Sequence, residues 1–253
     1  MHAGFAVLAA LAIFATGMAG GALALRTGGR GGGHRLLIAR LGAPAAAGVF
    51  LGAGFIHMLG DAGEGFARVL PQVDFPLAFL LAAVGFVAVL AIERVVFKAA
   101  TVAEGPSAYI LTLVLGLHSL LAGLALGVED TALVGIAIAI AIVAHKGAAA
   151  FALATSFVKA GMARPRAWRL IVTFCCITPL GIFAGRLLGN LLAERPGELV
   201  EAVFDSLAAG TFLYIAALDI IQEEFDDRAS SHVPAFLALL AGLMLMAVIA
   251  IWT

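Results

Sequence analysis

Two histidines lie near the middle of consecutive apolar segments, His118 within residues 107–128 and His145 within residues 131–158. If both segments cross a membrane as antiparallel helices, their imidazoles arrive at the same depth. Ionisable groups in the hydrocarbon cost about 2.5–3.5 kcal/mol each, so they usually mark a site or a pathway. Neutral imidazole is a common ligand of zinc and related cations. The spacing predicts a metal site between the two helices, and its alternative is a pair of packed, hydrogen-bonded histidines.

Other polar residues lie toward the ends of the apolar segments. His57 falls ~9 Å beyond the centre of its segment at 1.5 Å per residue, and Asp61 follows one turn further. Asp205 lies just inside one end of segment 199–221, and Asp219 and Glu223 lie at its other end. Together these residues predict an outer funnel, a midplane site and an inner exit for a cation. The alternative is ordinary decoration of the membrane interface by charges that reach toward water, which applies most to Asp61 and Glu223.

Lys146 lies inside an apolar segment, next to His145, and we predict that it belongs to the cation pathway. An ammonium beside a dication site repels the metal and is costly to bury. Two resolutions remain open from the residues alone: Lys146 loses its proton, or it pairs with a carboxylate such as Asp205. Either way it should oppose a second cation beside the first.

The elements that must position these residues are transmembrane helices. The chain is 63% hydrophobic and 12% charged, far from the usual soluble balance, and a spanning helix needs ~20 apolar residues. We predict an all-α polytopic membrane protein whose residues 1–253 form a single transmembrane domain. The first apolar segment lacks the basic start of a signal peptide and is counted as a helix. The eight predicted spans cover roughly 3–25, 43–63, 75–97, 107–128, 131–158, 168–193, 199–221 and 233–252.

Charge fixes the expected orientation. Eleven Lys and Arg residues lie in or beside the odd-numbered loops and three beside the even-numbered ones. Short cytoplasmic loops carry the basic excess, so both termini are predicted outside the cytoplasm. The formal net charge of −1 argues against a nucleic-acid partner, which would need a basic face.

Five stretches of the chain resemble the ZIP (Zrt/Irt-like) family of metal transporters. They are GVFLGAGFIHMLGDA (48–62), HSLLAGLALG (118–127), HKGAAAFALA (145–154), TPLGIFAG (178–185) and AAGTFLYIAALDIIQEE (208–224). The likeness covers most of the chain from about residue 40 onward. The His-Lys pair at 145–146 is similar to the animal branch of that family that has His-Lys at this position. Most other members of the family have His-Glu there.

The resemblance implies a 3+2+3 ZIP fold, in which two inverted three-helix repeats flank helices four and five. It also implies import of zinc-type cations toward the cytoplasm and both termini outside. A second copy of the chain is an expected partner, in a homodimer. His118 and His145 match the family's primary-site ligands, and Ser119 matches a position that helps a second metal where it is Asn. Asp219 matches an acidic position of the inner exit.

The departures from the family pattern change the expected site. The acidic residue four positions after His118 is Ala122, the ligand position four after His145 is Ala149, and the usual acidic neighbour of His145 is Lys146. We therefore expect a mononuclear site at most. Its predicted ligands are His118 and His145, with Ser119, Asp205 or water.

These observations predict a low-affinity importer of zinc or a broader range of divalent cations, including cadmium, with no cofactor and no enzymatic activity. Its predicted location is a cell membrane, with a bacterial inner membrane favoured. One alternative is a ZIP-fold membrane protein that binds metal or regulates but no longer transports. Another is a membrane enzyme with a metal or haem centre, although the sequence has no HExxH motif. Transport of a different substrate is the third.

Overall fold

The computed structural model describes residues 3–27, 33–97, 106–129, 131–192, 195–225 and 232–251. These residues form mainly helices, and no strand occurs among them. Seven of the described helices are long and apolar enough to cross a bilayer. The last helix, α10 (Val233–Ile249), has 17 residues, the lower end of the spanning range of about 17–25. The predicted all-α polytopic class is confirmed.

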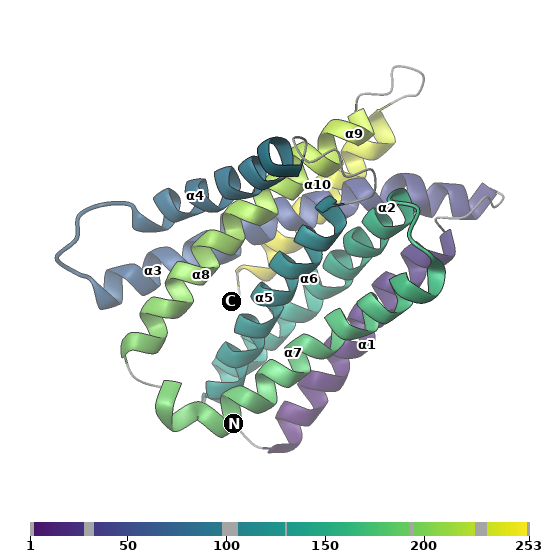
Figure 1. The fold of residues 1–253 in the computed structure, drawn as a ribbon. Coiled ribbons are helices and arrows are strands. Elements are labelled where there is room, and N and C mark those ends of the chain that lie inside the picture. Colours follow the sequence, from purple (N-terminus) through teal and green to yellow (C-terminus); the bar gives the residue numbers. More distant parts are fainter. Residues whose placement is uncertain are drawn as a thin grey trace.

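Eight helical rods correspond to the eight predicted spans (Figure 1). Three of them contain π-helical stretches, labelled η. The rods are α1 (Ala3–Thr27); α2 (Gly33–Gly52), η1 (Ala53–Met58) and α3 (Leu59–Val69); α4 (Leu77–Ala91) and η2 (Ile92–Phe97); α5 (Pro106–Val128); α6 (Ala132–Lys159); α7 (Arg164–Leu192); α8 (Arg195–Tyr214), η3 (Ile215–Ile221) and α9 (Gln222–Phe225); and α10. The second rod begins at Gly33 rather than near residue 43, because the sequence RLLIAR that follows the glycines has good helix propensity.

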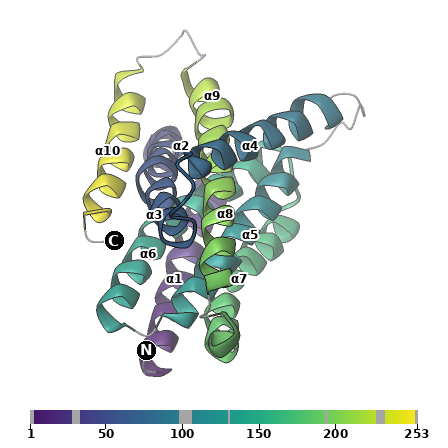
Figure 2. The ribbon, with the colours of Figure 1, turned by 90° about the vertical axis from the view of Figure 1, so that its left-hand side faces the viewer.

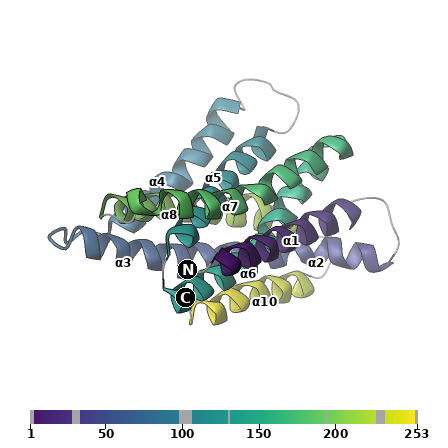
Figure 3. The same ribbon diagram turned by 90° about the horizontal axis from the view of Figure 1, so that it is seen from below.

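The rods pack as two bundles. In the first, here called the site bundle, α5 packs on α7, α1 packs on α6 and α7, and α6 contacts α5. In the second, the flanking bundle, α2 packs on α10, and α8 packs on α4 and α3. Figure 1 shows α1, α5, α6 and α7 side by side, and Figure 3 shows α10 at the edge of the molecule. Contacts between the bundles are fewer and involve mainly α2 with α6 and α5 with α8.

The packing repeats in an order that relates the first three rods to the last three. The contact of α1 with α6 is matched by that of α7 with α5, and the contact of α2 with α10 by that of α8 with α4. The closest crossings repeat as well. A Cβ on Gly48 would lie 1.9 Å from the Leu239 carbonyl oxygen, and a Cβ on Gly210 would lie 1.9 Å from that of Ala82. Because the first and sixth rods run in opposite directions, this is the inverted 3+2+3 arrangement that the resemblance implied.

The two ends of the molecule differ in what they carry. An even number of crossings returns the chain to the end where it began, and Figure 2 shows both termini toward one end. At the opposite end, Arg164 at the start of α7 donates from Nη2 to the Leu25 carbonyl oxygen at the end of α1, over 2.9 Å. The basic residues described at this opposite end include Lys159, Arg164, Arg166 and Arg169, which belong to one of the loops predicted to be cytoplasmic.

Candidate metal site

His118 on α5 and His145 on α6 lie next to each other in the site bundle. Their ring centroids are 5.7 Å apart, and the residues are 6% and 5% exposed. With a Zn–N bond of about 2.1 Å and ~1.1 Å from nitrogen to ring centre, two imidazoles on one tetrahedral zinc ion would have centroids roughly 5 Å apart. The observed spacing therefore suits a shared ion after a small adjustment.

His57 joins this pair. Its ring centroid lies 6.4 Å from that of His145, whereas the sequence placed it in the outer funnel, beyond the midplane. The surrounding segment η1 is π-helical, a wider turn that is common at functional sites and that regular helix spacing does not anticipate. Three imidazoles from three rods thus line one cavity.

Several nitrogens of these rings are buried without a partner. Both nitrogens of His118 and Nδ1 of His145 have no hydrogen bond to any part of the chain that the structure describes. Buried polar atoms are usually paired, so an orphaned one calls for an explanation such as an ion or water. Among those same residues, no three His, Cys, Asp or Glu side chains converge tightly enough to form a closed metal group. The site offers imidazole donors and leaves other coordination positions to oxygen or water.

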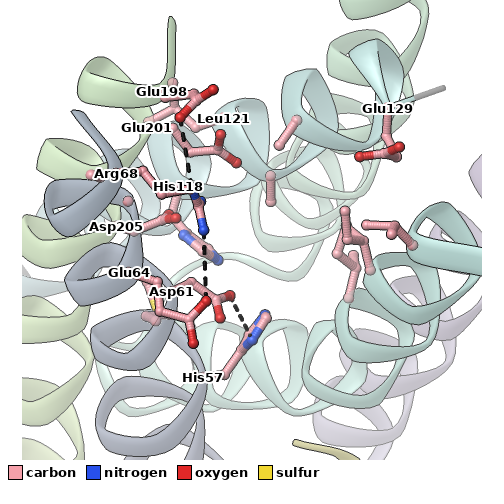
Figure 4. Close-up of a pocket in the computed structure, with 18 of the residues that line it drawn as sticks. His57, Asp61, Glu64, Arg68, His118, Leu121, Glu129, Glu198, Glu201 and Asp205 are labelled. Carbon is pink, nitrogen blue, oxygen red and sulfur yellow. Dashed lines mark ion pairs between the residues drawn. The ribbon is translucent and has the colours of Figure 1, made fainter. Parts of the chain in front are cut away.

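A cavity of about 320 Å³ leads from the histidines to the end of the molecule that carries the termini. Figure 4 shows carboxylates around it, from α3, from α8 and from Glu129, which directly follows α5. Both Asp61 and Asp205 line it, and Asp61 Oδ2 lies 2.9 Å from His57 Nδ1. The lining carboxylates are Asp61, Glu64, Glu129, Glu198, Glu201 and Asp205.

Arg68 supplies positive charge at the mouth of this cavity. Its Nη1 lies 3.6 Å from Glu64 Oε2 and its Nε lies 3.7 Å from Glu198 Oε2. The guanidinium therefore links α3 to α8 through two exposed carboxylates, and Figure 4 shows both ion pairs. The deeper carboxylates of Glu201 and Asp205 have no such contact with it.

Lys146 does not line the cavity and is 1% exposed. Its Nζ donates to Ser119 Oγ at 2.9 Å, to Thr178 Oγ1 at 3.0 Å and to the Phe174 carbonyl oxygen at 3.3 Å. It also lies 3.7 Å from the centroid of the Phe174 ring. Two hydroxyls and a carbonyl therefore take the place of the carboxylate partner that the sequence left open. Ser119 accepts from Lys146, and its role as a metal ligand stays a prediction.

Two predicted pathway residues cannot be placed at the level of side chains. Asp219 lies in η3 and Glu223 in α9, but both side chains lie outside the described part of the chain. Their assignment to the inner exit stays a prediction.

The sequence analysis missed several residues that line the cavity, among them Glu64, Arg68, Glu198 and Glu201. Helical spacing would have found them. Residues 57, 61, 64 and 68 recur at intervals of three and four, as do 198, 201 and 205, and such residues share one face of a helix. No comparable local signal predicts that Thr178 and Phe174 hold Lys146.

Comparison with known proteins agrees with this architecture. Residues 99–250 match the family model described as ZIP Zinc transporter. The chain is 28% identical to human "Zinc transporter ZIP2" over 87% of each chain. It is 30% identical to "Zinc transporter ZIP1" of Takifugu rubripes, over 80% of this chain and 81% of that one. It is 37% identical to "Zinc transporter ZIP1" of Danio rerio, over 55% of this chain and 45% of that one.

Proposed function

Because this chain belongs to the ZIP zinc transporter family, we propose that it carries zinc through the cavity that ends at His57, His118 and His145. The observation that carries the proposal is the meeting of three imidazoles, several of their nitrogens unpartnered, at the closed end of an acidic cavity. Carboxylates attract a dication toward the site, and imidazoles with few oxygens favour zinc or cadmium over magnesium and calcium.

The site takes one ion at a time. Ala122 lines the cavity and Ala149 is buried, and neither supplies a carboxylate where the family pattern has a ligand. Lys146, next in the chain to His145, already donates a hydrogen bond to the Ser119 hydroxyl. A second dication beside the first would therefore find that hydroxyl engaged and few anionic donors. His118 and His145 are the proposed ligands, with His57, Asp205 or water completing the shell.

Transport proceeds by alternating access between the two bundles. The cavity opens toward one end, while Leu115, Ala149 and Phe212, on the other side of the histidines, are at most 3% exposed. Inverted repeats are typical of transporters in which one bundle moves against the other around a midplane site. The hydrogen bonds of Lys146 join rods of the site bundle, so that bundle moves as one unit.

The proposed direction is inward. The basic loops at the end opposite the cavity favour a cytoplasmic location for that end, so the cavity faces outward and zinc enters from outside. We place the protein in a cell membrane, with a bacterial inner membrane favoured, and expect a homodimer. The bias of basic loops supports this sidedness, and the cavity opens at the end opposite to them.

Zinc uptake into proteoliposomes that enclose a fluorescent zinc indicator tests the proposal. His118→Ala and His145→Ala should each lower the initial rate by roughly tenfold or more, as loss of a metal-site residue does elsewhere. His232→Ala is the matched control, because His232 stacks on Phe225 at 5.6 Å, outside the cavity. Normal flux in both site variants would overturn the site. No flux from folded wild-type protein would favour the non-transporting alternative, with the missing carboxylates at 122 and 149 as the reason.

A further inference from the structure

Phe50 and Phe212 form a tilted pair of aromatic rings next to His118. Their ring centroids are 4.9 Å apart at an interplanar angle of 55°, and both residues are 0% exposed. Phe212 also meets the ring of His118 edge-on, with centroids 5.0 Å apart. Phe50 and Phe212 belong to the flanking bundle and His118 to the site bundle. The pair is thus a surface of the flanking bundle against which His118, a proposed metal ligand of the site bundle, packs.

The two phenylalanines occupy equivalent positions in the inverted repeats. Phe50 comes two residues after Gly48, and Phe212 comes two residues after Gly210, the glycine that makes the matching close crossing. The π-helical stretches η1 and η3 begin three residues after each phenylalanine. Equivalent residues that touch each other lie at the axis that relates the repeats. For inverted repeats that axis lies in the membrane plane, so the pair sits at mid-depth.

Phe212 lies between two acidic residues in the sequence of its rod. Asp205, seven residues before it, lines the cavity, and Asp219 comes seven residues after it in the chain. The residues from Asp205 to Phe212 are α-helical, so they span two turns, or about 10 Å. An ion that leaves the histidines toward the Asp219 end therefore meets two apolar rings first. Apolar constrictions block ions because water withdraws from them.

We propose that Phe50 and Phe212 form the inner barrier of the transport pathway. They are a fixed apolar plug, built from the flanking bundle, that separates the metal site from the cytoplasmic half of the protein. This inference rests on the proposed function, since a barrier matters only if ions pass. It differs from ordinary core packing in one consequence: loss of a ring should connect the outer cavity to the inner half without unfolding the bundle.

Thiol labelling from outside intact cells tests this consequence without measuring transport. The reporter is Ala216→Cys, a fully buried position one turn beyond Phe212, in a background where Cys175 and Cys176 are replaced by alanine. A membrane-impermeant methanethiosulfonate should label it slowly when Phe212 is present. We expect Phe212→Ala to speed labelling by roughly tenfold or more, and Phe212→Leu to restore protection because it keeps an apolar side chain there.

Phe86→Ala is the matched control, because Phe86 packs edge-on against Tyr214 within the flanking bundle and away from the cavity. If Phe212→Ala does not accumulate in the membrane, Phe50→Ala removes the other ring of the pair, and the same labelling rate is measured in that variant. The proposal is overturned if labelling stays slow in the folded Phe212 or Phe50 alanine variants, or if Phe86→Ala speeds it equally. Failure of the proposed function would appear instead as absent zinc flux in the wild type, whatever the labelling pattern.

Discussion

At the scale of single residues, the donor set at the floor of the cavity bears on metal choice. Three imidazoles line it, and neutral nitrogen donors bind borderline metals better than hard, oxygen-seeking ones. We expect cadmium at an equal concentration to compete strongly with zinc uptake. Magnesium or calcium at about a hundredfold excess should leave uptake within a factor of two. Competition in the proteoliposome assay measures this directly, and strong inhibition by magnesium would argue for a carboxylate-dominated site.

Lys146 leads to a prediction about stability. Its Nζ donates to three acceptors, and one of them is Thr178 Oγ1. A valine at position 178 would offer no acceptor in its place. Thr178→Val should therefore lower the free energy of unfolding by about 1–3 kcal/mol, because it removes an acceptor from a buried charge. Lys146→Met removes the charge itself and should be close to neutral.

Thermal unfolding in detergent measures both variants. The double variant Lys146→Met with Thr178→Val should be more stable than Thr178→Val alone, since no charge remains to be satisfied. Lys146→Met should also keep zinc flux within about threefold of the wild type, because Lys146 lies outside the cavity. Flux as low as that of His145→Ala would return Lys146 to the pathway, where the sequence analysis placed it.

At the scale of elements, the contact between α5 and α7 depends on two pairs of glycines, each pair four residues apart. They are Gly123 and Gly127 on α5, and Gly181 and Gly185 on α7. A Cβ on Gly123 would lie 2.4 Å from the Thr178 carbonyl oxygen, and one on Gly181 would lie 2.5 Å from that of Leu120. Small residues allow membrane helices to approach this closely. Gly181→Ala must push the two helices apart, and we expect a loss of about 1–3 kcal/mol of stability.

Gly60→Ala provides the comparison for that variant. Gly60 lies in α3 with no atom within 4 Å of a Cβ built on it, so alanine there should be neutral or slightly stabilising. The melting temperatures of the two purified variants distinguish the cases. Equal melting temperatures would mean that α5 and α7 can move apart to fit the added methyl group without loss of stability.

The elements were largely predictable, because long apolar runs broken by short polar turns have one stable form in a membrane. The depth match of His118 and His145 followed from their central positions in consecutive rods. The position of His57 did not follow, because η1 departs from the 3.6-residue repeat on which the estimate relied. Two of the three partners of Lys146 were also hidden, since Phe174 and Thr178 lie about 30 residues later on α7 and their contacts depend on how the rods pack.

At the scale of the whole molecule, polar contacts tend to stay within a bundle. Arg164 ties α7 to α1 in the site bundle, and the Tyr214 hydroxyl donates to Glu93 over 2.8 Å in the flanking bundle. Across the boundary, the contacts described above are between rings, such as His118 with Phe212. Rings slide past one another more easily than paired charges separate. This division is what two bundles need if they are to move without breaking apart.

Charge is also divided at this scale, although its formal sum is only −1. The described residues that line the cavity include six carboxylates and one basic side chain, Arg68. A cavity lined mainly by one sign of charge concentrates the opposite ion and speeds its capture, and salt screens that effect. Zinc uptake should therefore have a KM that rises with ionic strength while its maximal rate stays constant.

Arg68→Gln sharpens this last prediction. Without the guanidinium, no positive charge offsets the carboxylates of Glu64 and Glu198, so KM for zinc should fall roughly threefold at about 10 mM salt, where the Debye length is about 30 Å. At about 1 M salt the difference from the wild type should vanish, because the screening length shrinks to about 3 Å. Arg68→Lys keeps the charge and should behave as the wild type. If Arg68 serves only to hold α3 against α8, Arg68→Gln would instead lower the maximal rate equally at both salt concentrations, and the charge of the cavity would have no part in capturing the ion.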